Sequence, residues 1–280
     1  MCMTIRCAPA QRDHGGQSEY PPGGRSAGWR GDPAILDRVS WTESLEEAAA
    51  FADVVIECIV EDLAVKQDYF QKLDALCPLS TVLTTNTSAI SVTEIAGKAV
   101  HKERIIGTHF WNPAYLVPLV EVIRTKYVSE ETVAAVFQLM EEAGKKPVLV
   151  KKDVPGFLAN RMQHALFREA ISIVENGIAE AGDVDDAIKY GFGMRLGVSG
   201  PMEVIDRGGL DLTYSIHKYL FPHIESSAEP SKLMVQLMDE GKLGFKTGEG
   251  FQLWSPGQVK ASNETLTRGL IQVSRALGRL

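Results

Sequence analysis

The chain has 280 residues, of which 45% are apolar and 23% charged, a balance typical of a globular protein with one or two hydrophobic cores. Its 36 acidic residues outnumber 29 basic ones, giving a net charge of -7. This charge argues against nucleic acid and anionic membrane surfaces as partners. We therefore expect the partner to be a small molecule.

The cysteines and the apolar runs exclude further classes. Cys2, Cys7, Cys58 and Cys77 show neither CxxC spacing nor a matching pair of histidines, which argues against a zinc site and a disulfide framework. No apolar run approaches the roughly 20 residues of a membrane helix, and residues 1–12 lack the apolar core of a signal peptide. We expect a cytoplasmic protein without a metal, with an arginine-rich transit peptide as the alternative for the opening segment.

The first 40 residues differ from the rest of the chain. They are rich in Gly, Pro, Arg and Ser and show no helical or strand period. Such a segment buries too little apolar surface to offset the entropy cost of ordering it. We therefore expect residues 1–40 to be disordered.

From Trp41 onward, segments typical of strands and helices alternate. Continuous apolar runs indicate buried strands, and helical spacing or a capping box such as the one at Ser91 indicates helices. The expected strands span 52–60, 81–85, 105–109, 119–123 and 147–150, and the expected helices span 43–51, 61–76 and 130–143. This alternation predicts an α/β domain over residues 41–152 with a mainly parallel sheet.

After Asp153 the pattern changes to long helices, expected at 156–176, 183–190 and 202–220. Residues 153–280 are therefore predicted to form a second, all-helical domain. Apolar residues keep helical spacing along the first of these helices, from Phe157 to Val174. We expect that helix to be largely buried and the domain to form a homodimer.

A histidine and a glutamate stand in two of the expected strands. His109 ends the strand 105–109, and Glu121 lies inside the apolar run 119–123, where a carboxylate is costly unless it is paired. If the two side chains meet, the carboxylate fixes the imidazole tautomer and raises its pKa, which makes His109 a usable general base. A buried histidine with satisfied hydrogen bonds explains these two residues, taken alone, equally well.

Four further polar residues fall at positions where ligands bind in open α/β sheets. Ser88 follows the strand 81–85, and Glu61 and Lys66 follow the strand 52–60, at the carboxyl edge of the sheet. Asn160 lies in the first turns of the helix 156–176. Taken singly, each is better explained as an ordinary turn, a solvated ion pair or an exposed helix residue.

Together these segments resemble the 3-hydroxyacyl-CoA dehydrogenase family over about residues 41–254. The similar segments occur in the family's order: ADVVIECIVEDLAVKQDYFQKLD, TNTSAIS, GTHFWNPAYLVPLVEVI, GFLANRM and the glycine-rich turn LGFKTGEGFQLW. The resemblance implies NAD-dependent oxidation of a 3-hydroxyacyl-CoA, or a related 3-hydroxy acid, to the 3-oxo compound. It also implies a Rossmann-type first domain.

The resemblance assigns roles to individual residues. By it, His109 is the base, Glu121 orients His109, and Ser88 and Asn160 contact the substrate or its reactive oxygen. The residues that it places along the nicotinamide half of NAD are Glu61, Lys66, Ser88 and Asn112.

Two departures from the family leave alternatives open. The strand, GxGxxG turn and helix that begin the family are not found before Trp41, so we interpret the fold as a truncated Rossmann type and expect weak NAD binding. The alternative to an active enzyme is an inactive binding or scaffold protein that has lost cofactor binding. The residues 111–115 and 191–195 are more similar to the branch of lambda-crystallin and the gulonate or carnitine dehydrogenases, which favours a hydroxy acid without CoA.

Overall fold

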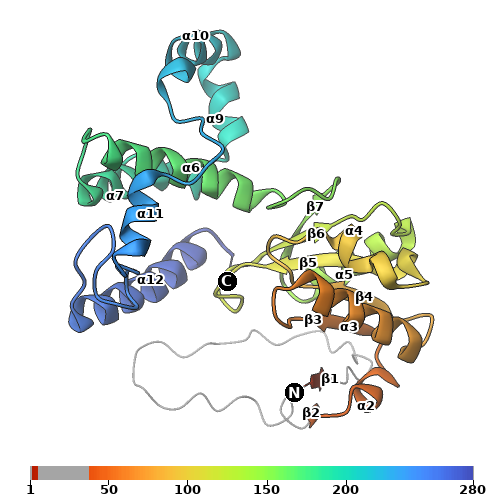
Figure 1. The fold of residues 1–280 in the computed structure, drawn as a ribbon. Helices are drawn as coiled ribbons and strands as arrows, with labels where there is room; N and C mark the ends of the chain where they lie inside the picture. The colour runs from red at the N-terminus through yellow and green to blue at the C-terminus, as the bar shows by residue number, and fades with distance from the viewer. Residues whose placement is uncertain (1, 6–37, 280) are drawn as a thin grey trace. The chain divides into compact units, whose positions relative to one another are not determined.

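The computed structural model describes residues 2–5 and 38–279 (Figure 1). Contacts divide the chain into two compact units. The first comprises Met1–His109, Val122–Leu139 and Leu149–Asp153, and the second comprises Phe110–Glu121, Met140–Val148 and Val154–Leu280. The chain passes from the first unit to the second for the last time after Asp153, next to the domain boundary expected from the sequence.

Two short strands stand apart from the main sheet. Strand β1 (Cys2–Ile5) pairs antiparallel with β2 (Val39–Thr42). The expectation that residues 1–40 are disordered is wrong for these strand residues, because each strand satisfies the backbone groups of the other. Pairing between segments that are far apart in the sequence is not visible as a repeating pattern within either segment. The rest of that expectation, over residues 6–37, lies outside the described residues.

A five-stranded sheet forms the centre of the α/β part. Its strands are β3 (Val54–Glu57), β4 (Val82–Thr85), β5 (Ile105–Phe110), β6 (Leu119–Ile123) and β7 (Lys146–Val150), in the order β3-β4-β5-β6-β7. Strand β4 pairs in parallel with both β3 and β5. The predicted Rossmann-like, mainly parallel sheet is therefore confirmed.

The strand β3 is shorter than the apolar run that predicted it. It ends at Glu57, where the carboxylate accepts a hydrogen bond of 2.5 Å from the backbone N–H of Ile59 and turns the chain out of the sheet. A continuous apolar run marks a buried segment but does not mark where its backbone leaves the ladder.

The helices of the first unit begin at residues with capping side chains. They are α2 (Leu45–Ala49), α3 (Leu63–Leu76), α4 (Val92–Ile95) and α5 (Glu130–Glu142). Asp62 caps α3 by accepting from the N–H of Val65, and the predicted cap Ser91 accepts from the N–H of Glu94. The expected stop after α5 is Gly144, whose φ of 72° is a left-handed conformation that favours glycine.

Close packing fixes one glycine of the sheet. A Cβ atom added at Gly107 in β5 would lie 2.8 Å from Cβ of Ile123 in β6 and 2.9 Å from Cγ2 of Val92 in α4. Because real atoms do not approach so closely, only glycine lets these two strands and this helix meet. This close packing holds β5 in place two residues before His109.

A buried ion pair joins α3 to the segment before β5. Asp74 and Arg104 lie 2.8 Å apart with side chains about one-twentieth exposed, and Asp74 also accepts from the backbone N–H groups of Val100 and His101. Burial alone would raise the pKa of Asp74, but these partners outweigh it and hold the pKa below its ordinary value. The pair therefore stabilises this corner of the unit at neutral pH, and that stabilisation is lost only as the pH falls below the ordinary range of an aspartate.

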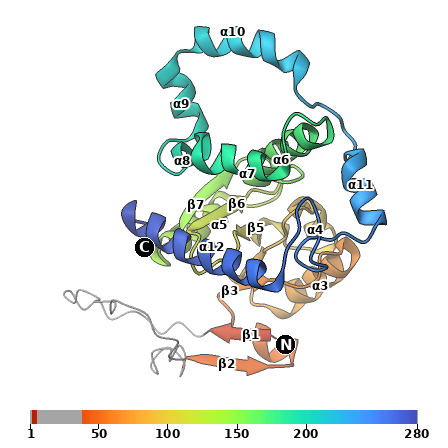
Figure 2. The ribbon, with the colours of Figure 1, turned by 90° about the vertical axis from the view of Figure 1, so that its left-hand side faces the viewer.

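The second unit is helical after Asp153, as predicted (Figure 2). Its helices are α6 (Ala159–Glu175), α7 (Ala181–Tyr190), α8 (Phe192–Leu196), α9 (Pro201–Gly208), α10 (Leu210–Leu220), α11 (Lys232–Asp239) and α12 (Pro256–Ala276). Within the described ranges, none of the helices combines the length and the hydropathy that crossing a membrane requires.

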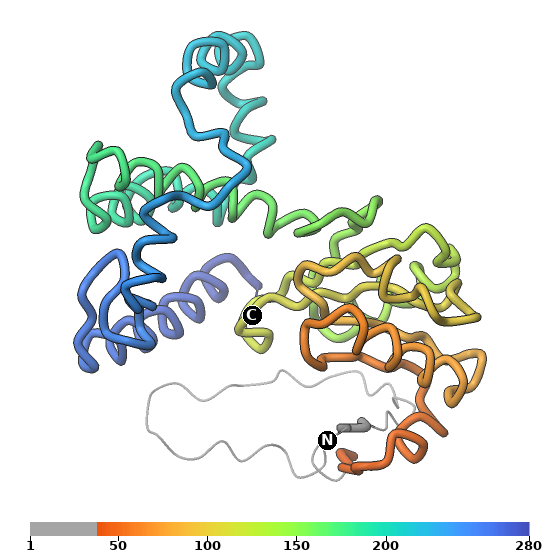
Figure 3. Tube along the Cα trace, in the orientation of Figure 1, coloured from red at the N-terminus to blue at the C-terminus, as the bar shows by residue number. Residues whose placement is uncertain are grey.

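The single helix expected over 202–220 is wrong. The chain forms α9 and α10 with a break at Gly209, whose φ is 94°, and Figure 3 follows the trace through the bend. A side chain at this position would be strained, because an added Cβ would lie 2.7 Å from Oδ1 of Asp211. The helical spacing continues on both sides of the break, so the pattern alone does not show it.

The helix over 156–176 is confirmed as α6, but its expected burial is wrong for the single chain. Leu158, Met162 and Phe167 are each 44–51% exposed. Among the described residues after Phe157, no apolar side chain is buried. Helical spacing predicts which face of a helix is apolar, but it does not tell whether the same chain covers that face.

Candidate active site

The structure brings a serine hydroxyl and an imidazole together at one edge of the sheet. His109 lies at the end of β5 and is 6% exposed, whereas Ser88 follows β4 and is exposed. Because β4 and β5 are parallel neighbours, their carboxyl ends share an edge, and Oγ of Ser88 lies 3.1 Å from Nε2 of His109. Two of the residues selected from the sequence therefore form one polar pair at the edge where ligands bind in such sheets.

Glu61 holds the turn that carries Ser88. One of its carboxylate oxygens accepts from Oγ1 of Thr87 (2.5 Å) and from the backbone N–H groups of Ser88 (3.0 Å) and Ala89 (3.3 Å). Its side chain is 41% exposed, so its outer edge also reaches solvent. The carboxylate fixes the backbone of the turn and still presents a charge at the sheet edge.

The charged state of Glu61 is favoured by these contacts. Burial would raise the pKa of Glu61, but the Thr87 hydroxyl, the Ala89 and Ser88 N–H groups and the Lys66 charge together hold it below the ordinary value. The folded-state pKa is therefore the lower one. The clamp is present above the ordinary glutamate pKa and weakens only as the pH falls through the depressed value.

Lys66 lies beneath this turn and not at the open edge. Its side chain is 1% exposed, and its Nζ contacts Glu57 at 2.8 and 3.1 Å and Glu61 at 3.4 Å. The ammonium group is thus shared by two carboxylates. In this structure the charge is enclosed by protein, and the expected contact of Lys66 with a phosphate or ribose stays a prediction.

The sequence analysis missed Glu57, the last residue of β3. Its side chain is fully buried, and besides Lys66 it accepts from Oγ1 of Thr85 (2.6 Å) and the N–H of Ile59. An acidic residue inside the apolar run 52–60 was the available signal, because a carboxylate in such a run needs partners. The same reasoning selected Glu121.

Glu121, in the second unit, is completely buried and caps a helix. One carboxylate oxygen accepts from the backbone N–H groups of Leu158 and Ala159 at 2.9 Å each, and the other accepts from Nε1 of Trp111 at 3.1 Å. No side chain at the helix's own amino terminus caps α6, so Glu121 takes this place. Its charge also opposes the positive end of the helix dipole, which favours the ionised form.

The backbone before α6 is bent to reach Glu121. Gly156 has a φ of 73° and Phe157 a φ of 49°, both in the left-handed region, and the Phe157 side chain is 2% exposed. A non-glycine residue in this region costs about 1–2 kcal/mol, which buried packing and the two hydrogen bonds to Glu121 offset. Glycine before a helix that lacks a capping residue was the sequence signal for this arrangement.

The remaining predicted residues lie in the second unit. Asn112 is exposed in the turn between β5 and β6, and Asn160 is partly exposed in the first turn of α6. The hydrogen bond expected between His109 and Glu121 stays a prediction, as do the substrate and cofactor contacts of the two asparagines.

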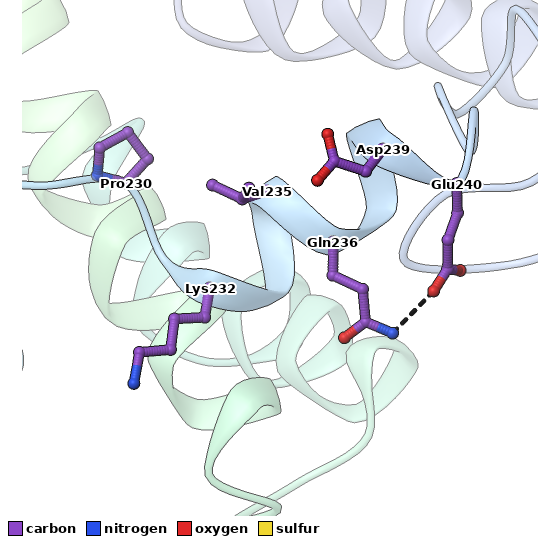
Figure 4. Close-up of a pocket in the computed structure, with 6 residues that line it drawn as sticks. All are labelled: Pro230, Lys232, Val235, Gln236, Asp239 and Glu240. Carbon is purple, nitrogen blue, oxygen red and sulfur yellow. Dashed lines mark hydrogen bonds between the residues drawn. The ribbon is translucent and has the colours of Figure 1, made fainter.

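Other features of the described residues are less suited to a site. Burial and the neighbouring Glu57 charge raise the pKa of the Cys58 thiol, which disfavours a thiolate nucleophile. No cluster of three metal-ligating side chains occurs in the described ranges. A hollow of about 600 Å³ along α11 is lined by residues of one short segment, in which Lys232 and Asp239 point apart and Gln236 bonds to Glu240 (Figure 4).

Comparison with known proteins identifies relatives over most of the chain. Residues 30–154 match the family described as "3-hydroxyacyl-CoA dehydrogenase, NAD binding domain", and residues 156–254 match its "C-terminal domain". The first match begins earlier than the resemblance noted from about residue 41, whereas the second ends at the same residue.

Two relatives and one solved structure illustrate the range of substrates. The chain is 34% identical to the 5-formyl-3-hydroxy-2-methylpyridine 4-carboxylate 5-dehydrogenase of Mesorhizobium japonicum, over 87% of this chain and 79% of that protein. It is 40% identical to a probable 3-hydroxybutyryl-CoA dehydrogenase of Bacillus subtilis, over 78% of this chain and 75% of the relative. The crystal structure of a dehydrogenase with the same pyridine substrate, an NAD+-dependent dismutase, aligns with a TM-score of 0.81 and 34% identity over 85% of this chain and 77% of that one.

Proposed function

This chain belongs to the 3-hydroxyacyl-CoA dehydrogenase family, and we propose that it oxidises the 3-hydroxyl group of an acyl-CoA to a ketone with His109 as the general base. The observation that carries this proposal is the pair formed by His109 and Ser88 at the carboxyl edge of the sheet. The family's enzymes are oxidoreductases, and NAD is their cofactor.

In the proposed reaction, Ser88 and His109 bind the substrate hydroxyl. The exposed Ser88 hydroxyl donates to the substrate oxygen, and Nε2 of His109 removes the hydroxyl proton. Glu121 orients His109 and stabilises the imidazolium ion that forms, and Asn160 contacts the reacting oxygen. These roles of Glu121 are supported by its burial and by the hydrogen bonds that fix its carboxylate.

The residues at the sheet edge fit the nicotinamide half of NAD. NAD supplies the hydride acceptor when it is bound. Glu61 and Ser88 are both exposed, and a carboxylate and a hydroxyl are suitable partners for ribose and amide groups. Asn112, also exposed, completes the proposed contacts. Lys66 does not fit a direct contact, because its charge is buried between two carboxylates.

A hydroxy acid without CoA is the second candidate substrate, favoured by the relative from Mesorhizobium japonicum. NADH formation should be measured with (S)-3-hydroxybutyryl-CoA and with free 3-hydroxybutyrate, L-gulonate and L-carnitine. We expect the CoA ester to have the highest kcat/KM. If only a free acid is turned over, the proposal of a CoA ester as substrate is wrong and that acid takes its place. If none of the four compounds is turned over, the result favours the inactive scaffold protein. Calorimetric titration with NAD then tests the weak affinity expected from the sequence.

We also propose that the helical unit forms a homodimer. The helices α9 and α10 carry large exposed apolar side chains, including Met202, Leu212, Tyr214 and Ile216. The same unit contains an apolar cavity of about 580 Å³ between α6, α7, α11 and the glycine-rich turn. Surfaces of this kind are rare on stable monomers, and a two-fold dimer would let each copy cover the other.

Sedimentation at micromolar concentration should give twice the chain mass of 30.6 kDa. Ile216→Asp places a charge on the exposed apolar surface and should shift the mass towards one chain. Ser215→Asp, at the neighbouring exposed polar position of α10, is the matched control and should sediment like the unmodified protein. A monomeric unmodified chain would refute the dimer. The expected cytoplasmic location stays a prediction.

A further inference from the structure

The turn that carries Ser88 is connected to two fully buried charges. Glu61 bonds the backbone of the turn with one carboxylate oxygen and contacts Lys66 with the other. Lys66 in turn contacts Glu57, whose second partner is the hydroxyl of Thr85 at the end of β4. The same hydroxyl accepts from the N–H of Thr87. Lys66 is therefore linked to the Ser88 turn by two routes, one through Glu61 and one through Glu57 and Thr85.

We propose that Glu57 and Lys66 are positioning residues that hold the backbone of residues 87–90, and with it Ser88, at His109. Neither side chain has the exposure needed to touch a substrate, since both are at most 1% exposed. They act through Glu61 and Thr85. This inference rests on the proposed function for its consequence in turnover, but the geometry of the turn is open to a separate test.

Competition for the ammonium group explains why Glu57 matters. Lys66 makes its two shorter contacts with Glu57 and only one of 3.4 Å with Glu61. Because Lys66 binds mainly to Glu57, it attracts Glu61 only weakly. Oε1 of Glu61 therefore keeps its hydrogen bonds to the Thr87 hydroxyl and to the Ser88 and Ala89 N–H groups. Neutralising Glu57 would leave Glu61 as the single charged partner of Lys66 and draw it away from the turn.

The structure offers a matched control in Asp74. Like Glu57, Asp74 is a buried carboxylate paired with a cation at 2.8 Å, but it bonds the N–H groups of Val100 and His101 and does not touch the Ser88 turn. A general loss of stability should follow from neutralising either residue. Only Glu57 should affect the turn.

Amide hydrogen exchange on the whole chain separates the two effects. In Glu57→Gln, the amides of residues 87–90 should exchange at least about tenfold faster, as expected when charged hydrogen bonds are weakened, while residues 100–101 keep their rates. Asp74→Asn should give the reverse pattern. Unchanged rates at 87–90 in Glu57→Gln, or equal acceleration in both segments, would overturn the proposal.

A second variant guards against misfolding from an unpaired buried charge. Glu57→Gln combined with Lys66→Met removes both charges, a change that buried ion pairs often tolerate. It should fold, and because Glu61 then loses the contact with Lys66 and the Thr85 hydroxyl loses its carboxylate partner, the amides of residues 87–90 should again exchange faster than in the unmodified chain. The kcat for the substrate identified above should fall more than tenfold, and KM should change less. Wild-type kcat in this variant would refute the positioning role. Absence of turnover in the unmodified chain would instead refute the proposed function, and the exchange test would still decide the inference.

Discussion

Replacing His109 by alanine should lower kcat by roughly 10²- to 10⁴-fold, the range that a general base contributes. The reason is that Nε2 of His109 lies 3.1 Å from the exposed Ser88 hydroxyl, where the substrate oxygen is proposed to bind, and alanine offers no group that could take its proton. NADH formation under saturating substrate measures the effect. The change in KM should be smaller, because Ser88 and the surrounding turn remain to bind the substrate oxygen.

The control for this prediction is His101→Ala. His101 belongs to the same unit, but its side chain is 42% exposed and its contact is with Glu103 at the surface. Its removal should leave turnover unchanged. Turnover in His109→Ala equal to that of the unmodified protein would exclude His109 as the base.

The second large effect concerns stability. Glu121→Ala should lower the free energy of unfolding by about 3–6 kcal/mol, because three part-buried N–H donors lose their acceptor and each costs about 1–2 kcal/mol when unsatisfied. Urea denaturation followed by circular dichroism measures this loss. The amino terminus of α6 should loosen first, because Leu158 and Ala159 supply two of the three donors.

Trp111→Phe tests the same network from the other side. It removes one donor and leaves the two hydrogen bonds to α6 intact, so it should cost about 1 kcal/mol. A similar loss in both variants, or a loss under about 1 kcal/mol in Glu121→Ala, would show that the carboxylate does not hold the helix.

The sequence predicted the features that depend on local patterns. The sequence predicted the strand that carries His109, which ends one residue later than expected at Phe110, and also the turn at Ser88 and the cap at Ser91. Strands, turns and capping boxes can be predicted in this way because each depends on residues that are neighbours in the sequence. The sequence placed Ser88 at the carboxyl edge of the sheet and expected His109 to meet Glu121, whereas its contact with Ser88 follows from the parallel pairing of β4 and β5.

The features that escaped prediction depend on distant partners. Glu121 was expected to need a partner, but its donors Leu158 and Ala159 come 37 and 38 residues later in the chain. Lys66 follows a strand in the way that many exposed lysines do, and only the fold shows that Glu57 and Glu61 enclose it. The exposure of α6 depends on what covers it, which helical spacing does not encode.

The buried pair of Glu57 and Lys66 limits how this sequence can evolve. Losing Lys66 first leaves the Glu57 charge buried without a cation, at a cost of about 3–5 kcal/mol, and losing Glu57 first leaves Lys66 with Glu61 as its one charged partner, whereas losing both together is tolerated far better. Each single replacement therefore gives a protein that is less stable than one with either the charged pair or the neutral pair. Substitutions at the two positions should therefore be non-additive: the effect of a change at position 57 should depend on which residue stands at position 66.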